Sequence, residues 1–156
     1  RQTLYTAEDL TRFKAKQAKK RLEAINPQTK VKAFHEQILP NNVYLLKADV
    51  VFDCTQDNAS TALIAEQCKK DKSPLIIVRS YGTAYSVIVS TKAVPAKLIS
   101  SLKEPDYEKE GILGATTREA AAVALVEAYK IILKATKGTY AVEGDVWKGT
   151  KKKTTL

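Results

Sequence analysis

The first part of the chain has the apolar spacing of a helix. Thr6, closely followed by two acidic residues, is typical of a helix start, and apolar side chains then recur every three to five positions up to Ile25. Pro27 ends this pattern, because the residue before a proline is disfavoured in helical geometry. The sequence therefore predicts one helix from Thr6 to Ile25, followed by a short strand over 31–34.

Continuous apolar runs mark the middle of the chain. They span 49–54, 74–79 and 85–90, with a helical pattern over 58–70 between the first two and a turn at 81–83. Continuous runs indicate strands with both faces buried, and strands that alternate with helices are typical of parallel sheets. We therefore predict an α/β protein with a largely parallel sheet and helices on both faces.

The last part of the chain predicts a connection, a helix and a final strand. Prolines and mixed charges over 92–111 indicate an irregular crossover segment. The stretch Thr116-Thr117-Arg118-Glu119 has the form of a capping box, and the alanine-rich residues that follow predict a helix over 116–134. Gly138 is a natural stop, and 140–147 is the last expected strand.

Composition narrows the class of protein. With 156 residues, 44% of them hydrophobic and 28% charged, residues 1–156 are expected to form a single domain rather than a disordered chain. No apolar run approaches the roughly 18 residues of a membrane span, and the first ten residues lack the apolar core of a signal peptide. Two cysteines cannot form a disulfide framework or a four-ligand zinc site. The expected compartment is the cytoplasm, with the nucleus as an additional location.

The basic charge raises the question of nucleic-acid binding. Lys and Arg number 26 against 17 Asp and Glu, a net charge of +9. The basic residues gather over 14–21, where a helical pattern predicts a solvated face, and over 151–153, near an end expected to fray. Only 7% of residues are aromatic, and they do not alternate with the basic ones as base-stacking surfaces require. We therefore treat a nucleic-acid-binding module as a minor alternative.

The individual residues that could carry chemistry have plain structural interpretations. The glycines form neither a dinucleotide fingerprint nor a P-loop. His35 is expected at the surface, and Cys54 and Cys68 are expected to be buried structural thiols. Asp53 and Asp57 flank the end of a predicted strand, where open α/β sheets place ligands, so metal binding and helix capping both remain open for Asp57.

A series of short motifs resembles a known family. The motifs are Arg1-Gln2, Lys14 thirteen positions after Arg1, Ile25-Asn26-Pro27, Asp49–Thr55 and Pro74-Leu75-Ile76. In this order and spacing they resemble the ThiF/MoeB/HesA superfamily, the adenylating domain of ubiquitin-like-protein activating enzymes. The late alanine-rich helix is similar to that of the family. The resemblance covers nearly the whole chain and implies a Rossmann-like fold.

The resemblance also implies a site for ATP and magnesium. By resemblance, Arg1 and Lys14 contact the ATP phosphates, for which both cations are suited. The family has a magnesium-binding aspartate in Asp-Cys-Thr-Asp-Asn, where this chain reads Asp53-Cys54-Thr55-Gln56-Asp57-Asn58. Counting forward from Asp53 places Gln56 at that position, and counting back from Asn58 places Asp57 there. We favour Gln56, and a neutral amide is a poorer magnesium ligand than a carboxylate.

The chain departs from the family in three further respects. It lacks the glycine-rich phosphate loop and the opening strand-helix-strand that carries it, so we expect a sheet that is incomplete at its N-terminal edge. The crossover segment 92–111 contains no cysteine that could form a thioester. The paired CxxC zinc motifs are absent, so no zinc is expected. Within the family, the chain looks most like the non-catalytic regulatory subunit for neddylation.

The resemblance therefore implies a subunit or portion of a ubiquitin-like-modifier activating enzyme, not self-sufficient in catalysis. Its implied partners are a homologous catalytic subunit and a ubiquitin-like protein. The alternative is an active ThiF/MoeB-type adenylyltransferase whose phosphate-loop segment lies outside this chain. We also expect an apolar association surface on the late helix, formed by Val123, Val126 and Ile131.

Overall fold

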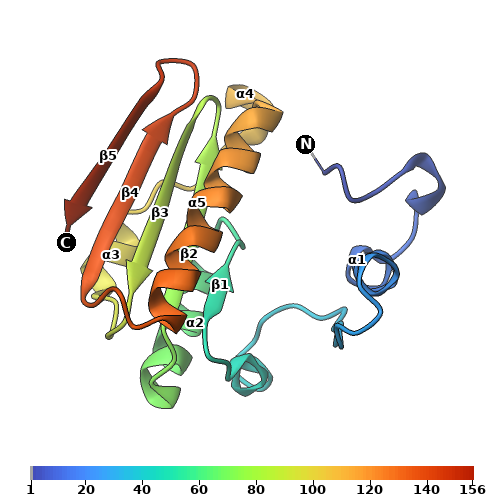
Figure 1. Cartoon of the computed structure of the whole chain (residues 1–156), viewed down its shortest axis with the longest axis horizontal. Helices are drawn as coiled ribbons and strands as arrows, with labels where there is room; N and C mark the ends of the chain where they lie inside the picture. Colours follow the sequence, from blue (N-terminus) through green and yellow to red (C-terminus); the bar gives the residue numbers. More distant parts are fainter. Residues whose placement is uncertain (1) are drawn as a thin grey trace. The chain divides into compact units, whose positions relative to one another are not determined.

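The computed structural model describes residues 2–156, in two compact units, Arg1–Gln37 and Ile38–Leu156 (Figure 1). The first unit contains a short 3-10 helix, η1 (Ala7–Asp9), and one α-helix, α1 (Lys14–Ile25). The single helix predicted from Thr6 is thus interrupted, because Thr11 adopts a left-handed backbone conformation with φ of 67°. A β-branched residue in that conformation cannot continue a right-handed helix.

The strand predicted over 31–34 does not form. The backbone of Val31 pairs instead with side chains of α1: its N–H donates to Glu23 Oε1 at 3.3 Å, and its C=O accepts from Lys19 Nζ. In a strand, the N–H and C=O groups of Val31 would pair with a neighbouring strand, but here they are already hydrogen-bonded to side chains of α1.

The second unit is built on a five-stranded sheet. Its strands are β1 (Val51–Asp53), β2 (Leu75–Tyr81), β3 (Ala84–Ser90), β4 (Thr139–Asp145) and β5 (Thr150–Thr155). They lie side by side in the order of the chain, with β1 and β5 at the two edges (Figure 1). β1 pairs with β2 in parallel, and the other three pairs are antiparallel.

The prediction of a largely parallel sheet is therefore wrong beyond the first pair. Only Gly82 and Thr83 separate β2 from β3, and a two-residue connection can join only antiparallel strands, since a parallel pair needs a long crossover. Gly82 has a φ of 51°, which this tight hairpin uses. The expected frayed end is also wrong: the lysines at 151–153 lie in β5, where pairing with β4 orders them.

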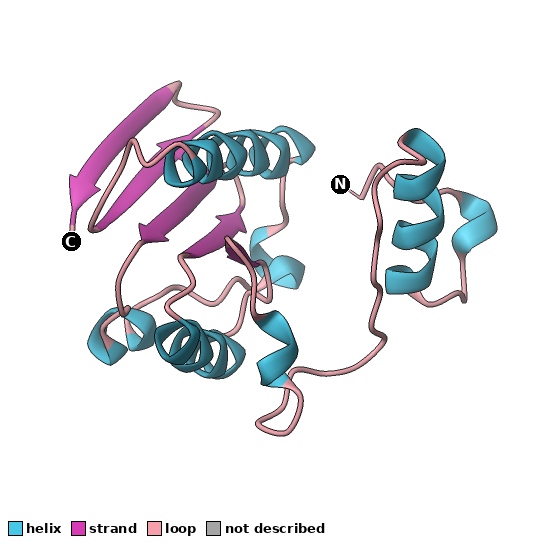
Figure 2. Cartoon of the chain, turned by 60° about the horizontal axis from the view of Figure 1, so that its bottom comes forward, coloured by secondary structure: helices cyan, strands magenta, loops and turns pink. Residues whose placement is uncertain are grey.

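Helices cover both faces of this sheet, which confirms the predicted α/β class (Figure 2). The helices of this unit are η2 (Val43–Leu46), α2 (Asn58–Asp71), α3 (Ala96–Ser100), α4 (Tyr107–Glu110) and α5 (Gly114–Ile132). α5 packs on one face against side chains such as Ile76 and Val87, and α2 and α3 pack on the other against Leu75 and Ile77. The segment predicted as an irregular crossover thus contains two short helices.

The helix α5 begins two residues before the predicted capping box. Its N-cap is Leu113, and the hydroxyl of Thr116 donates to the carbonyl oxygen of Gly82 at 3.1 Å rather than to its own helix. Thr116 therefore fastens α5 to the β2–β3 turn. Local sequence could not show this role, because the acceptor lies 34 positions earlier in the chain.

Apolar side chains remain exposed along α5 and at the β1 edge. On α5 the exposed residues are Leu125, Val126, Tyr129 and Ile132, and Phe52 on β1 is 45% exposed. The prediction is right for Val126 but wrong for Val123, which is buried, and Ile131 packs partly against the core. None of the helices in residues 2–156 is long and apolar enough to cross a bilayer.

Candidate functional site

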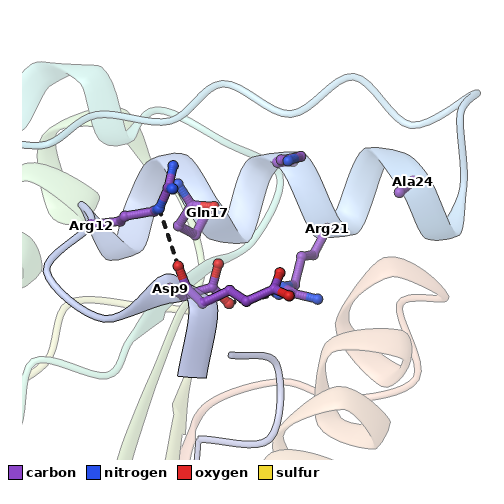
Figure 3. Close-up of a pocket in the computed structure, with 7 residues that line it drawn as sticks. Asp9, Arg12, Gln17, Arg21 and Ala24 are labelled. Atoms are coloured by element: carbon purple, nitrogen blue, oxygen red, sulfur yellow. Dashed lines mark hydrogen bonds and ion pairs between the residues drawn. The ribbon is translucent and has the colours of Figure 1, made fainter. Parts of the chain in front are cut away.

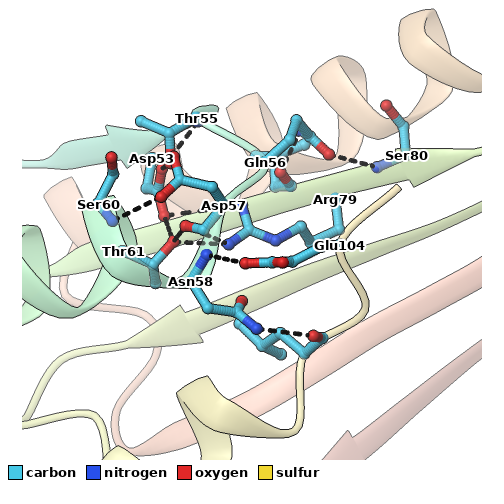
Figure 4. A network of polar contacts seen from close by, with 12 residues as sticks. Asp53, Thr55, Gln56, Asp57, Asn58, Ser60, Thr61, Arg79, Ser80 and Glu104 are labelled. Carbon is cyan, nitrogen blue, oxygen red and sulfur yellow. Dashed lines mark hydrogen bonds and ion pairs between the residues drawn. The ribbon is translucent and has the colours of Figure 1, made fainter. Parts of the chain in front are cut away.

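The carboxyl end of β1 leads directly into the N-terminus of α2. Asp57 caps this helix, because its carboxylate accepts a hydrogen bond from the Ser60 N–H at 2.7 Å. The capping interpretation of Asp57 is confirmed, and one of its carboxylate oxygens is committed to the helix end. The other residues of this segment form the polar network in Figure 4.

The Gln56 side chain makes two hydrogen bonds to the backbone of β2, where β2 extends beyond the end of β1. Its side-chain Nε2 donates to the Val78 carbonyl oxygen at 2.8 Å, and its Oε1 accepts from the Ser80 N–H at 3.3 Å (Figure 4). Its backbone holds a φ of 67°, which costs energy in a residue other than glycine. An aspartate or glutamate could not donate to Val78, so this pairing requires an amide.

Asp53 is fully buried at the end of β1. It accepts hydrogen bonds from the Thr55 N–H at 2.9 Å, from the Thr55 hydroxyl at 2.6 Å, and from the Thr61 hydroxyl. Its nearest cation is Arg79, whose Nη1 lies 3.8 Å from Asp53 Oδ2. The carboxylate of Asp53, the first residue of the Asp53–Asn58 motif, is thus surrounded by hydrogen-bond donors of the chain.

Arg79 is the residue of this network that sequence reasoning missed. It is 1% exposed, and its Nη2 donates to the Thr61 hydroxyl at 2.6 Å and to the Asp57 carbonyl oxygen at 3.3 Å. Nε and Nη1 have no hydrogen-bond acceptor among the residues that the structure describes. The signal was present as the one charged residue that ends the apolar run over 75–78. A charge in such a run indicates a buried partner.

The crossover segment is attached to the same helix end. The Asn58 N–H donates to Glu104 Oε1 at 2.6 Å, and Asn58 Nδ2 donates to the Leu102 carbonyl oxygen at 3.0 Å. The Asn58 N–H and the Asp57 carbonyl belong to one peptide group. Arg79 therefore binds one end of this peptide and Glu104 the other, which polarises it in a single direction.

The candidate phosphate ligands lie in the first unit. Lys14 is exposed and is the first residue of α1. Arg1 lies outside the residues that the structure describes. Gln56 and Asp57 belong to the second unit, where they are adjacent in the β1–α2 connection.

The first unit contains a cleft of about 300 Å³ between η1 and α1. Arg21 binds Asp9 there through Nη2 at 2.7 Å and Nε at 3.2 Å, and Figure 3 shows both residues with Arg12 and Gln17 around the cleft. Asp9 also accepts from the Thr6 N–H at 2.8 Å. These contacts fasten η1 to α1, which is a structural role.

The two thiols differ in their surroundings. Cys68 is buried as predicted, and burial raises its pKa to about 11. The prediction is wrong for Cys54, which is exposed, although desolvation by its neighbours and the charge of Asp53 still raise the pKa of its thiol. The reason is strand alternation: Val51 and Asp53 point into the core, so Cys54 points out. Neither environment favours a reactive thiolate.

His35 lies at the surface, as predicted. Its ring lies against that of Phe13, with centroids 3.9 Å apart. Among residues 2–156, no group of three or more His, Cys, Asp or Glu side chains is arranged to hold a metal ion.

β1, α2 and β2 form a β-α-β unit with polar groups at the carboxyl ends of its parallel strands, the position where open α/β domains place ligands. The ThiF family matches residues 1–155, and the chain belongs to the ThiF family. Among its relatives, HesA (vegetative) of Trichormus variabilis is 31% identical over 120 residues, which is 74% of this chain and 45% of that protein. The ThiS adenylyltransferase of Escherichia coli is 26% identical over 140 residues, covering 85% and 56%.

Solved structures show the same fold. The crystal structure of E. coli MccB with ATP superimposes with a TM-score of 0.76 at 16% identity, over all of this chain and 51% of MccB. The crystal structure of PaaA superimposes with a TM-score of 0.70 at 16% identity, over 98% of this chain and 58% of PaaA. The chain spans about half the length of the curated relatives it matches.

Proposed function

We propose that this chain is a supporting portion or regulatory-type subunit of an enzyme that activates a ubiquitin-like protein by adenylation. Membership of the ThiF family supports this proposal, as does the similarity to an adenylyltransferase that acts on the sulfur carrier ThiS. In such a reaction ATP supplies an adenylyl group to the carrier's C-terminal carboxylate, and pyrophosphate leaves. The proposed partners are a homologous catalytic subunit and the ubiquitin-like protein, in the cytoplasm.

The residues of the chain fit a nucleotide better than they fit magnesium. The exposed ammonium group of Lys14 is suited to a polyphosphate, and Arg1 would add a planar guanidinium. Their proposed task is to bind and orient phosphate groups. Gln56, by contrast, has both amide atoms bound to the backbone of β2, so a magnesium ion does not fit on it.

This use of Gln56 is the observation that carries the regulatory assignment. Because Gln56 uses its amide to bind the backbone of β2, this position does not offer a carboxylate to a metal ion. Asp57 already uses one carboxylate oxygen to cap α2. We therefore assign the metal-binding carboxylate of the reaction to the catalytic partner.

ATP–pyrophosphate exchange tests this proposal. The 156-residue chain is purified alone and after co-expression with a second ThiF-family protein of the same genome. Each sample is assayed with a ubiquitin-like protein that ends in glycine. We expect no exchange from the chain alone and carrier-dependent exchange from the complex, with the rate lowered by Lys14→Gln and unaffected by the control Lys16→Gln.

Two outcomes would contradict the proposal. Robust carrier-dependent exchange by the chain alone would favour the alternative of an active adenylyltransferase. A complex that does not form, or that forms without exchanging, would remove the supporting role.

A further inference from the structure

One face of the sheet is only half covered by helix. α5 packs on this face over β2 and β3, and Figure 1 shows that no helix of the second unit crosses β4 and β5 on the same side. Beside α5 lies a hollow of about 530 Å³. Its apolar lining comes from Ala122, Val123 and Val126 of α5 and from Val142 of β4. Val126 is 51% exposed there, which is unusual for a side chain beside a sheet core.

Three lysines of β5 line the other side of this hollow, namely Lys151, Lys152 and Lys153. In the β4–β5 register, Lys153 lies opposite Val142 and Lys151 lies opposite Gly144. Directly opposed residues share a face, so both lysines are on the α5 side of the sheet. The ammonium group of Lys153 confirms this, because it lies 3.7 Å from the centre of the Tyr140 ring in the α5-side core.

The acidic residues of the hollow are committed to other partners. Glu127 accepts from the Tyr140 hydroxyl and from Lys130 Nζ at 2.6 Å. Glu119 accepts from the Tyr85 hydroxyl at 2.8 Å. Within residues 2–156, no ion pair involves Lys151 or Lys153. Lys153 also interacts electrostatically with the Glu127 carboxylate, so its charge is partly compensated. The hollow therefore combines apolar side chains with cations that have no ion-pair partner of their own in the described part of the chain.

Lys152 also contributes to the lining of the hollow, although it lies opposite Glu143 in the strand register. With Lys130 of α5, four lysines line the hollow against two glutamates, Glu119 and Glu127. The lining therefore carries an excess of positive charge.

We propose that the hollow between α5 and β5 docks an acidic amphipathic helix of a partner protein. Helices are the elements that cover sheet faces, and α5 already does so next to this position. The apolar side of the docked helix would contact Ala122 and Val126, which are exposed, and its acidic residues would face Lys151 and Lys153. Charge complementarity selects an acidic helix, because the lysines that line the hollow outnumber its glutamates four to two. The inference does not depend on the proposed adenylation role.

Binding of a synthetic peptide to the 156-residue chain tests this proposal. The probe is a fluorescein-labelled helical peptide of about 18 residues, five turns, with leucine along one side and glutamate elsewhere. A peptide of the same composition in scrambled order cannot form the apolar side and serves as the matched ligand control. We expect the amphipathic peptide to bind, with at least about tenfold weaker binding by the scrambled peptide.

Matched variants locate the binding site. Lys151→Glu with Lys153→Glu should weaken binding at least about tenfold, whereas Lys92→Glu with Lys97→Glu should change it less than about twofold, because these two exposed lysines do not line the hollow. On α5, Val126→Asp should weaken binding strongly, and Leu125→Asp should not, because Leu125 is exposed but does not line the hollow. The α5 pair keeps the test decisive if a β5 variant fails to fold.

Three results would overturn the proposal. Equal losses from the Lys92/Lys97 and the Lys151/Lys153 double variants would indicate general attraction of a polyanion to this basic chain, as would equal binding of the scrambled peptide. Absence of binding by the amphipathic peptide up to about 1 mM would remove the docking surface. Equal losses from Leu125→Asp and Val126→Asp would place binding on the outer side of α5 instead.

Discussion

At the scale of the residue, the buried charge of Arg79 positions the groups at the carboxyl end of β1. Arg79 joins β2 to Asp53 at the end of β1, to Thr61 in the first turn of α2, and to the Asp57 carbonyl. Each of these groups belongs to a different element, so the guanidinium sets their relative positions. A buried ion pair contributes little net stability when both partners are present, but removing one partner leaves an uncompensated charge.

We therefore expect Arg79→Met to lower the free energy of unfolding by about 3–5 kcal/mol. The methionine nearly preserves the volume but leaves Asp53 buried without a cation. Urea denaturation followed by circular dichroism measures the change. Arg118→Met, which removes an exposed arginine of α5, should change stability by less than about 0.5 kcal/mol. Equal small effects from both variants would show that the Asp53–Arg79 pair does not hold β1, β2 and α2 in their relative positions.

At the scale of the element, two tyrosines and a glycine hold α5 to the sheet. Tyr85 of β3 binds Glu119, and Tyr140 of β4 binds Glu127, so each strand is linked to α5 through a phenol and a carboxylate. Gly144 of β4 makes room for this arrangement. A Cβ atom there would lie 2.5 Å from the Tyr85 ring, well inside van der Waals contact.

Gly144→Ala should lower stability by about 1–3 kcal/mol, because the added methyl group displaces the Tyr85 ring and its bond to Glu119. Gly114→Ala is the matched control, since a Cβ atom at that first position of α5 meets no other atom within 4 Å. It should be neutral or stabilising by up to about 1 kcal/mol. Thermal unfolding of the two variants checks this expectation, and similar Tm values would contradict it.

The same tyrosines make stability depend on alkaline pH. Burial, reinforced by the hydrogen bond to Glu119, raises the pKa of Tyr85 to about 12, and burial with the bond to Glu127 raises the pKa of Tyr140 to about 12. Because these folded-state values exceed the usual 10.0, their stabilising effect is fully present below pH 10 and is lost as the pH rises towards 12.

We expect the free energy of unfolding to fall over that alkaline range, and to fall less steeply in Tyr85→Phe and Tyr140→Phe. Urea unfolding at a series of pH values measures the slope. Tyr129→Phe should keep the wild-type slope, because Tyr129 is exposed and lies outside these two links. An unchanged slope in both buried variants would show that the phenols do not carry the linkage.

At the scale of the whole molecule, the second unit has a buried core but leaves apolar side chains exposed on α5 and at the β1 edge. β1 is an edge strand, and α5 exposes Leu125, Tyr129 and Ile132 on successive turns. An unpaired parallel edge beside exposed apolar side chains favours association with another protein segment. Of the three residues expected on this surface, only Val126 is exposed, whereas Val123 is buried and Ile131 packs against the core.

We expect the isolated chain to associate as its concentration rises, and Leu125→Glu with Ile132→Glu to reduce that association without loss of fold. Light scattering over a dilution series measures it. Arg118→Glu with Lys134→Glu changes the charge of the same helix region away from the apolar side chains, and serves as the control. A chain that stays monomeric and dilution-resistant would count against a regulatory-type subunit.

Hydrophobic spacing alone located most elements of the second unit. The strands at 51–53, 75–81 and 84–90 and the helices at 58–71 and 114–132 lie within a few residues of their predicted positions. These elements form where local apolar patterns coincide with burial. The failures came where a distant group competed for the backbone or the side chain, as at Val31 and Thr116.

The candidate site divides in the same way. The motif order identified the ThiF family and the segment from Asp53 to Asn58, because short motifs and their spacing are carried by the sequence itself. Only the tertiary structure showed that the Gln56 side chain binds the backbone of β2, that Arg79 is the cation beside Asp53, and that the lysines of β5 line a hollow beside α5. Each of these depends on strand register, which joins residues far apart in the chain, and strand direction in turn was decided by the two-residue turn between β2 and β3.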